Sequence, residues 1–225
     1  MDRAIIKRKI NSSDMLKKIG VFIYSFVVGL CELKSGVYPF SICLLCAHEK
    51  YLFQIFLGCV VSGVLVVDGN YLQIAVAMII FGIKWLCLRK KGDVVFGVKL
   101  TLTVLSAAFI AFGEFLSGNL IFEGAMRSIM VFVSLPLITL AICAYTKKET
   151  RLGKYSREIS ILMYVFITIK SVAIFDVGFF SFSIVVASYL TLYFSRNGFA
   201  FGGVCGFVCG MSLGVAYMPI LGIMG

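Results

Sequence analysis

The sequence predicts an all-α, polytopic membrane protein in which about nine helices cross the bilayer. Apolar residues make up 60% of the chain and charged residues only 14%, whereas soluble domains have roughly 45–50% and about 25%. The apolar residues also form continuous blocks separated by short polar segments. Such blocks suit helices in a hydrocarbon layer about 30 Å thick better than the alternating strands of a barrel.

The nine blocks differ in how well they match the roughly 20 residues that a crossing helix needs. In chain order they are 19–33, 37–47, 51–67, 71–88, 94–116, 129–145, 159–175, 179–194 and 199–225. The first two are short, so we expect them to form a tight hairpin. Glu32, Lys34 and Gly36 would lie at its tip, and Pro39 near the start of its second helix. The basic segment 1–18 precedes this transmembrane domain (19–225) and is not followed by a signal-peptide cleavage site.

Basic residues in the loops predict the orientation of the chain. The loops on the N-terminal side hold 16 of the 21 Lys and Arg residues, and they are 1–18, 48–50, 89–93, 146–158 and 195–198. The opposite loops hold two, and they are 34–36, 68–70, 117–128 and 176–178. Because basic loops stay in the cytosol, the N-terminus is predicted to be cytosolic. The net charge of +10 therefore reflects topology and contact with lipid headgroups, and we expect no nucleic-acid partner.

Four charged residues fall inside the predicted spans, where charge often marks a transport path. Lys84, Lys99, Lys170 and Glu114 each lie roughly 5–9 Å inside a boundary at about 1.5 Å per residue. Lysine side chains reach the interface from that depth, so we interpret the lysines as snorkelling anchors. The alternative is an intramembrane ion pair between Glu114 and Lys170, both near the outer face.

Five glycines recur every fourth residue in the last block. They are Gly198, Gly202, Gly206, Gly210 and Gly214. Each glycine destabilises a helix by roughly 1 kcal/mol relative to alanine, so the stripe makes sense where close backbone packing offsets the loss. We predict a helix-packing interface, either within one chain or between two copies as self-association.

Motifs for catalysis and metal binding are missing from the sequence. The chain has no Gly-x-x-x-x-Gly-Lys phosphate loop and no His-Glu-x-x-His motif. The letters Gly-x-Ser-x-Gly occur at Gly210–Gly214, inside a continuous apolar block and not at the strand-to-helix turn that a nucleophile elbow requires. The single histidine ends the segment Cys43-Leu-Leu-Cys46-Ala-His48, which lacks a second pair of zinc ligands. We therefore predict no catalytic residue, metal site or cofactor in this chain, and interpret its eight cysteines as small apolar side chains.

Two stretches resemble one protein family. They are Ser35-Gly-Val-Tyr-Pro-Phe40 and Phe201-Gly-Gly-Val-Cys-Gly-Phe-Val-Cys-Gly-Met-Ser-Leu-Gly-Val-Ala216. Both are similar to parts of the N-terminal multi-span membrane domain of stage II sporulation protein E from spore-forming Firmicutes. The resemblance implies about ten spans joined to a manganese-dependent serine/threonine phosphatase that activates the forespore sigma factor. It also implies a place at the polar division septum of the bacterial cytoplasmic membrane, in association with the tubulin-like division-ring protein.

The resemblance implies that this chain anchors and localises such a phosphatase, whose manganese and catalytic residues would lie in another domain. Nine crossings from a cytosolic N-terminus leave residue 225 outside, so we expect the natural gene to continue with one more span.

The alternative function is a small polytopic transporter or a substrate-binding permease subunit. A transporter should carry polar residues at mid-depth in several spans. Here such residues are scattered, for example Ser106, Ser134 and Thr168, which favours the anchor.

The charge distribution predicts which cysteines an external reagent reaches. In a variant without native cysteines, Leu152→Cys in the 146–158 loop should react with a membrane-impermeant thiol reagent only after the cells are opened. Reaction in intact cells, under conditions that leave a known cytosolic cysteine unmodified, would contradict the predicted orientation.

Overall fold

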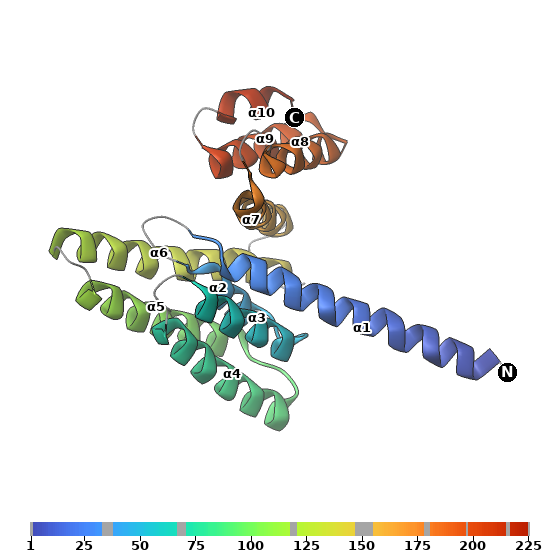
Figure 1. Ribbon diagram of the computed structural model, residues 1–225, viewed down its shortest axis with the longest axis vertical. Coiled ribbons are helices and arrows are strands. Elements are labelled where there is room, and N and C mark those ends of the chain that lie inside the picture. Colours follow the sequence, from blue (N-terminus) through green and yellow to red (C-terminus); the bar gives the residue numbers. More distant parts are fainter. Residues whose placement is uncertain are drawn as a thin grey trace. The chain divides into compact units, whose positions relative to one another are not determined.

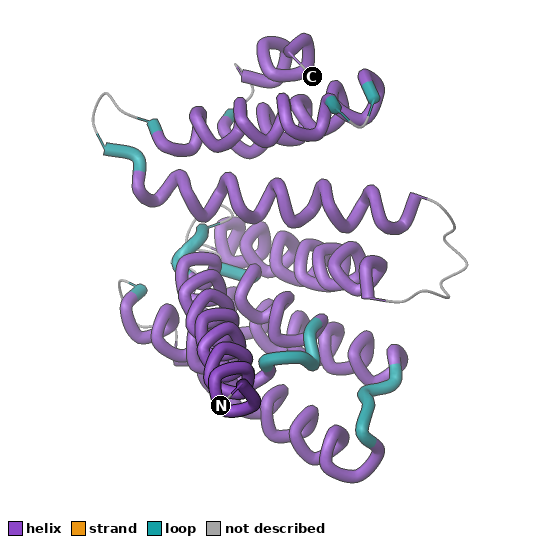
Figure 2. Tube along the Cα trace, turned by 90° about the vertical axis from the view of Figure 1, so that its right-hand side faces the viewer, coloured by secondary structure: helices purple, strands orange, loops and turns teal. Residues whose placement is uncertain are grey.

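Helices make up nearly all of the chain that the computed structural model describes, as the ribbon and the tube show (Figures 1 and 2). The described residues are 2–32, 38–66, 71–117, 121–146, 155–177, 181–196, 198–214 and 217–224. The elements that these residues form are all helices and include no β-strand. The all-α fold class is therefore confirmed for this part of the chain.

The helices fall into two compact units. In chain order they are α1 (Asp2–Gly29), α2 (Phe40–Ala47), α3 (Leu52–Leu65), α4 (Tyr71–Lys91), α5 (Phe96–Ser117), α6 (Ile121–Thr146), α7 (Tyr155–Val172), the 3₁₀ helix η1 (Ala173–Phe175), α8 (Phe182–Ser195), α9 (Phe199–Leu213) and α10 (Met218–Met224). Unit 1 comprises Met1–Leu30 and Val37–Pro136, and unit 2 comprises Cys31–Gly36 and Leu137–Gly225. Helix α6 belongs to unit 1 as far as Pro136 and to unit 2 beyond it.

Four helices of the described residues are long and apolar enough to cross a membrane. They are Tyr71–Lys90, Phe96–Leu116, Ile121–Cys143 and Arg157–Phe175. Three shorter apolar helices are Leu52–Leu65, Phe182–Ser195 and Ala200–Leu213. Large apolar side chains on these helices point outward, for example Leu105 and Phe112, each 62% exposed. A membrane location is therefore consistent with their length, composition and exposed surface.

Two predicted loop segments belong to helices. Helix α1 runs from Asp2 to Gly29, so the basic segment 1–18 continues into the first predicted span without a break. Helix α6 begins at Ile121, so most of the predicted outer loop 117–128 is helical. Glu123 and Arg127 lie one turn apart there, and their ion pair supports the helix although their charges predict a loop. Lys34 and Gly36 at the predicted hairpin tip, and 147–154 of the basic loop, lie outside the described residues.

The last predicted span, 199–225, does not form one helix. Helix α9 ends at Leu213, and Gly214 follows with a φ of 138°, which a residue with a Cβ rarely adopts. Helix α10 begins only at Met218 and has 7 residues. At about 10 Å it is too short to cross a bilayer, so the prediction of a continuous span is wrong at Gly214.

In unit 1, α1 and α3 pack closely along small residues four positions apart. A Cβ added to Gly58 would lie 2.8 Å from the Ser25 Cβ, and one added to Gly29 would collide with the Ser62 hydroxyl. Ser25 Oγ also donates a hydrogen bond to the Ile55 carbonyl at 2.9 Å. The contacts advance in the same direction along both helices, so α1 and α3 are parallel. Because α1 and α3 run in the same direction, the segment between them, which contains α2, must run back in the opposite direction.

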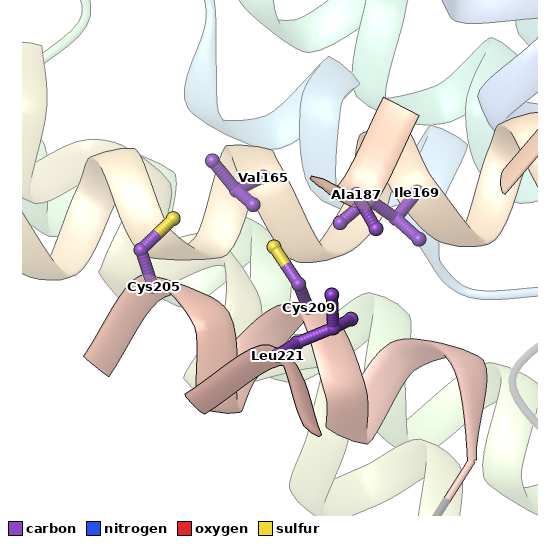
Figure 3. Close-up of a cluster of buried hydrophobic side chains, with 6 residues drawn as sticks. All are labelled: Val165, Ile169, Ala187, Cys205, Cys209 and Leu221. Carbon is purple, nitrogen blue, oxygen red and sulfur yellow. The ribbon is translucent and has the colours of Figure 1, made fainter. Parts of the chain in front are cut away.

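In unit 2, α9 packs against α7, α8 and α10 around one apolar cluster (Figure 3). Its buried members are Val165, Ile169, Ala187, Cys205, Cys209 and Leu221. The start of α8 is fixed separately by Asp176, whose carboxylate accepts hydrogen bonds from the Ser183 N–H at 2.9 Å and the Ser181 hydroxyl at 2.8 Å. These bonds satisfy backbone and side-chain donors at a helix end that has few partners of its own.

Alanine in place of Gly58 should destabilise unit 1. The new methyl group would lie 2.8 Å from the Phe26 nitrogen and from the Ser25 Cβ. Overpacking of this kind costs about 1–3 kcal/mol, which lowers Tm by several degrees in a chain of this size. Gly82→Ala is the matched control, because its new Cβ has no atom within 4 Å and alanine favours a helix. Equal melting temperatures for the two purified variants in detergent would contradict the close packing of α1 and α3.

Candidate functional site

The most unusual element of unit 1 is α2, a helix of 8 residues in which every side chain is buried. At 1.5 Å per residue it is about 12 Å long, so it does not reach both faces of a membrane. Pro39 stands directly before it, where the fixed φ of proline and its missing N–H do not oppose a helix start. Helices α1, α3, α4 and α5 all contact α2. The unpaired backbone groups at its ends therefore need partners inside the protein.

Gln73 of α4 holds the N-terminal end of α2. Its side-chain amide donates to the Tyr38 carbonyl at 2.7 Å and to Ser41 Oγ at 2.9 Å. Ser41 Oγ also accepts a hydrogen bond from the Cys59 thiol of α3 at 3.4 Å. Gln73 is 3% exposed, so these bonds form away from water. One buried amide thus joins α4 to the first turn of α2.

Lys84 of α4 holds the C-terminal end of α2. Its Nζ donates to the carbonyl oxygens of Leu45 at 2.7 Å, Cys46 at 3.0 Å and His48 at 2.6 Å. These oxygens, which we call the carbonyl site, belong to the end of a helix where carbonyls lack intrahelical partners and the helix dipole is negative. The lysine ammonium has three N–H donors, and three carbonyls lie within hydrogen-bond distance of it.

The interpretation of Lys84 as a snorkelling anchor is wrong. Its side chain is 0% exposed and its Nζ is hydrogen-bonded to the backbone at the end of α2, whereas a snorkelling lysine exposes its ammonium to headgroups or water. The physical reason is the short helix beside it. The carbonyls at the end of this helix lie within hydrogen-bond distance of the ammonium, so the side chain does not need to extend to headgroups or interfacial water. The sequence does contain a clue, because Lys84 and the end of the 37–47 block both lie near the same predicted cytosolic boundary.

The residues after α2 form a second polar contact at the same end of unit 1. Lys99 of α5 forms an ion pair with Glu49, and their side chains are 12% and 23% exposed. Burial, reinforced by the positive charges of Lys84 and Lys99, lowers the pKa of His48 to about 4. The imidazole is therefore neutral at physiological pH, and the charge near the carbonyl site comes from lysine. Lys99 lies in a candidate span, as predicted. Its ammonium forms an ion pair with Glu49, a partner that the interpretation as a snorkelling anchor did not include.

The glycine stripe contributes unequally to packing in unit 2. A Cβ added to Gly206 would lie 2.7 Å from the Leu221 carbonyl carbon of α10 and 3.0 Å from Thr191 Cγ2 of α8. Gly202 and Gly210 are buried on the same helix, whereas Gly198 and Gly214 are its two cap residues, with φ of 132° and 138°. The described close contact is therefore within one chain, at Gly206. Whether the stripe also serves self-association stays a prediction.

Glu114 and Lys170 belong to different units, so their predicted ion pair stays a prediction. Glu114 lies near the end of α5 in unit 1, is partly buried, and interacts electrostatically with Arg127 of α6. Lys170 lies in the last turn of α7 in unit 2 and is also partly buried. Each residue thus lies near the end of a membrane-length helix, as its position in the sequence predicts.

The cysteine side chains are buried, with the exception of Cys87, which is partly exposed, and all but Cys31 lie in helices. Cys43 donates to the Leu135 carbonyl at 3.6 Å, and Cys205 and Cys209 lie in the unit 2 cluster (Figure 3). Among the residues that the structure describes, no three His, Cys, Asp or Glu side chains gather where they would hold a metal ion. The site's chemistry is therefore that of backbone carbonyls and a lysine ammonium.

The residues that fix α2 and its neighbours were not predicted from the sequence. Gln73 and the pairs Ser25/Gly58 and Gly29/Ser62 were not predicted to have a role. The spacing Ser25-x-x-x-Gly29 and Gly58-x-x-x-Ser62 is a small-residue pattern that indicates close helix packing in membranes. The role of Gln73 depends on the position of α2 and has no such pattern in the sequence.

Leucine in place of Gly206 should destabilise unit 2, because its Cβ alone would collide with the backbone of α10. We expect a loss of about 1–3 kcal/mol or more, seen as a fall in Tm in detergent. Gly222→Leu, on α10 itself, has no atom within 4 Å of the new Cβ and should have a much smaller effect. A Tm that falls equally in both variants would show that Gly206 is not at a close interface.

Comparisons of this chain with models of protein families, with curated proteins and with solved structures gave no match. The function of the chain is therefore inferred from its own residues and contacts.

Proposed function

We propose that this chain is a multi-pass membrane domain that anchors and localises a protein, in the manner of the membrane part of stage II sporulation protein E. The observation that carries the proposal is that α2 is fully buried and that the side chains of Gln73 and Lys84 bind its two ends. The stretch Ser35–Phe40, one of the two on which the resemblance rests, leads into α2 through Tyr38, Pro39 and Phe40. Phe40 is 0% exposed, so this end of the stretch serves packing.

The polar contacts of α2 favour an anchor over a transporter. Transporters with interrupted helices direct the ends of the half-helices at substrates and coupling ions. Here Gln73 occupies one end of α2 and Lys84 the other. Two of the three polar side chains at mid-depth are also engaged, since Ser106 Oγ donates to the Leu102 carbonyl at 2.6 Å and Thr168 Oγ1 to the Tyr164 carbonyl at 2.7 Å, whereas the buried Ser134 hydroxyl has no hydrogen-bond partner among the described residues.

A groove between α4 and α5 supports the same proposal. It has a volume of about 130 Å³ and is lined by apolar side chains together with Ser106. Because the Ser106 hydroxyl already binds its own helix, the groove offers little to a polar substrate. Lipid chains are a sufficient occupant for such a surface.

The helix directions support the alternating topology that the loop charges predict. Helices α1 and α3 are parallel, as are α2 and α4, because Gln73 meets the start of α2 and Lys84 its end. Helices α5 and α6 are antiparallel, since Gly124 lies against Phe115 and Ser128 donates to the Ala111 carbonyl. We therefore propose that the helices alternate in direction from a cytosolic N-terminus, with the carbonyl site near the cytosolic face and α2 as an element that does not cross the membrane completely.

Localisation of a tagged chain tests the proposal. A fluorescent protein fused to the cytosolic N-terminus should mark a band at the polar septum when the chain is produced in a spore-forming bacterium during asymmetric division. The tubulin-like division-ring protein should co-purify after crosslinking. An even distribution around the cell membrane, equal to that of an unrelated multi-span protein with the same tag, would contradict the anchoring role.

A matched pair of variants connects localisation to α2. Phe40→Ala removes a side chain that is 0% exposed at the start of α2, which costs about 3–5 kcal/mol in a packed core. It should abolish septal enrichment, whereas Phe109→Ala, at a side chain 55% exposed, should preserve it. Septal enrichment that survives Phe40→Ala unchanged would separate the localising function from α2.

A further inference from the structure

We propose that the carbonyl site is a binding site for a monovalent cation, whose resident cation is the Lys84 ammonium, and that it accepts a free primary ammonium ion when this side chain is removed. The inference does not depend on the anchoring function. It rests on the geometry at the C-terminal end of α2, where one nitrogen lies 2.6–3.0 Å from the carbonyl oxygens of Leu45, Cys46 and His48.

The ligands of the site are backbone carbonyls, which carry partial negative charge and no protons. Carbonyl oxygens that replace the hydration shell of a cation are the usual ligands of monovalent ions inside membrane proteins. The C-terminal ends of interrupted helices serve the same purpose in transporters, because the helix dipole directs its negative end at the ion. In this chain that position is taken by a cation that is covalently tethered to α4.

The number and type of ligands favour a monovalent ion over a divalent one. Calcium and magnesium require six or more oxygen ligands, usually including carboxylates. The carboxylate nearest in sequence to the carbonyl site, Glu49, forms its ion pair with Lys99. A primary ammonium group presents three N–H donors, and the site presents three carbonyl acceptors at the distances of charge-assisted hydrogen bonds.

The shape of the vacated space identifies the probe. Lys84→Ala removes three methylene groups and the ammonium, and these are the heavy atoms of the n-propylammonium ion. The stem of Lys84 is buried together with its ammonium, so the same space should receive the propyl chain. Glu49 follows His48 in the chain, and its ion pair with Lys99 is partly exposed, so we expect a small ion to enter the site from this side.

Chemical rescue tests the proposal. Purified Lys84→Ala in detergent should melt several degrees below the natural chain, because the buried carbonyls of Leu45 and Cys46 and the partly buried carbonyl of His48 lose the hydrogen bonds from the ammonium. Addition of n-propylammonium chloride should raise this Tm in a saturable way and recover at least half of the loss, as expected for a ligand that binds only the folded state. The natural chain should show no such rise, because Lys84 fills its site.

The controls separate charge and hydrogen bonding from simple filling of space. 1-Propanol has nearly the same shape without the charge, and tetramethylammonium has the charge without N–H donors, so neither should restore the Tm. Lys99→Ala, at the other lysine of this end, should not respond to n-propylammonium. Equal rescue by 1-propanol, or no rescue by n-propylammonium, would overturn the proposal. Where Lys84→Ala aggregates on extraction, extraction in n-propylammonium should yield monodisperse protein, and continued aggregation would overturn it equally.

Discussion

The structure of unit 1 depends on one requirement, that the backbone of a short helix inside an apolar layer must have all its polar groups paired. A helix that crosses a bilayer places its unpaired ends in the headgroup region, where water satisfies them. Helix α2 is too short to do so, and its end at Leu45, Cys46 and His48 is satisfied by Lys84. An unpaired buried polar group costs several kcal/mol in such a layer, so α2 and the position of α4 depend on each other.

The close packing of α1 and α3 is the second constraint on unit 1. Both helices contact α2, and they also pack directly against each other. Ser25, Gly29, Gly58 and Ser62 let α1 and α3 approach until their backbones nearly touch. In unit 2, Gly206 does the same for α9 and α10. In a membrane, where burial of apolar surface does not drive helices together, small residues allow the van der Waals contacts that do.

The sequence predicted the middle helices well and the ends of the chain less well, for physical reasons. Helices α4 and α5 begin and end within three residues of the predicted blocks 71–88 and 94–116, because their boundaries are set by hydrophobicity. At the start of α6, a pair of opposite charges one turn apart sustains a helix that charge alone predicts to be a loop. At Gly214 the reverse holds, since continuous hydrophobicity predicts a span that a backbone conformation interrupts. The burial of Lys84 was not predicted because it depends on where another segment of the chain ends.

Lys84 also explains why α2 is suited to a static function. A buried ammonium loses far more solvation than one carbonyl returns, so it is stable in the interior only with its full set of hydrogen bonds. A small displacement of α2 would lengthen the bonds to Leu45, Cys46 and His48 together, because one nitrogen makes all three. The energy therefore rises steeply on either side of one position, unlike that of a helix held by apolar contacts, which slides at lower cost. The proposed role as an anchor is consistent with such a fixed element, whereas a transporter needs its interrupted helices to move between states.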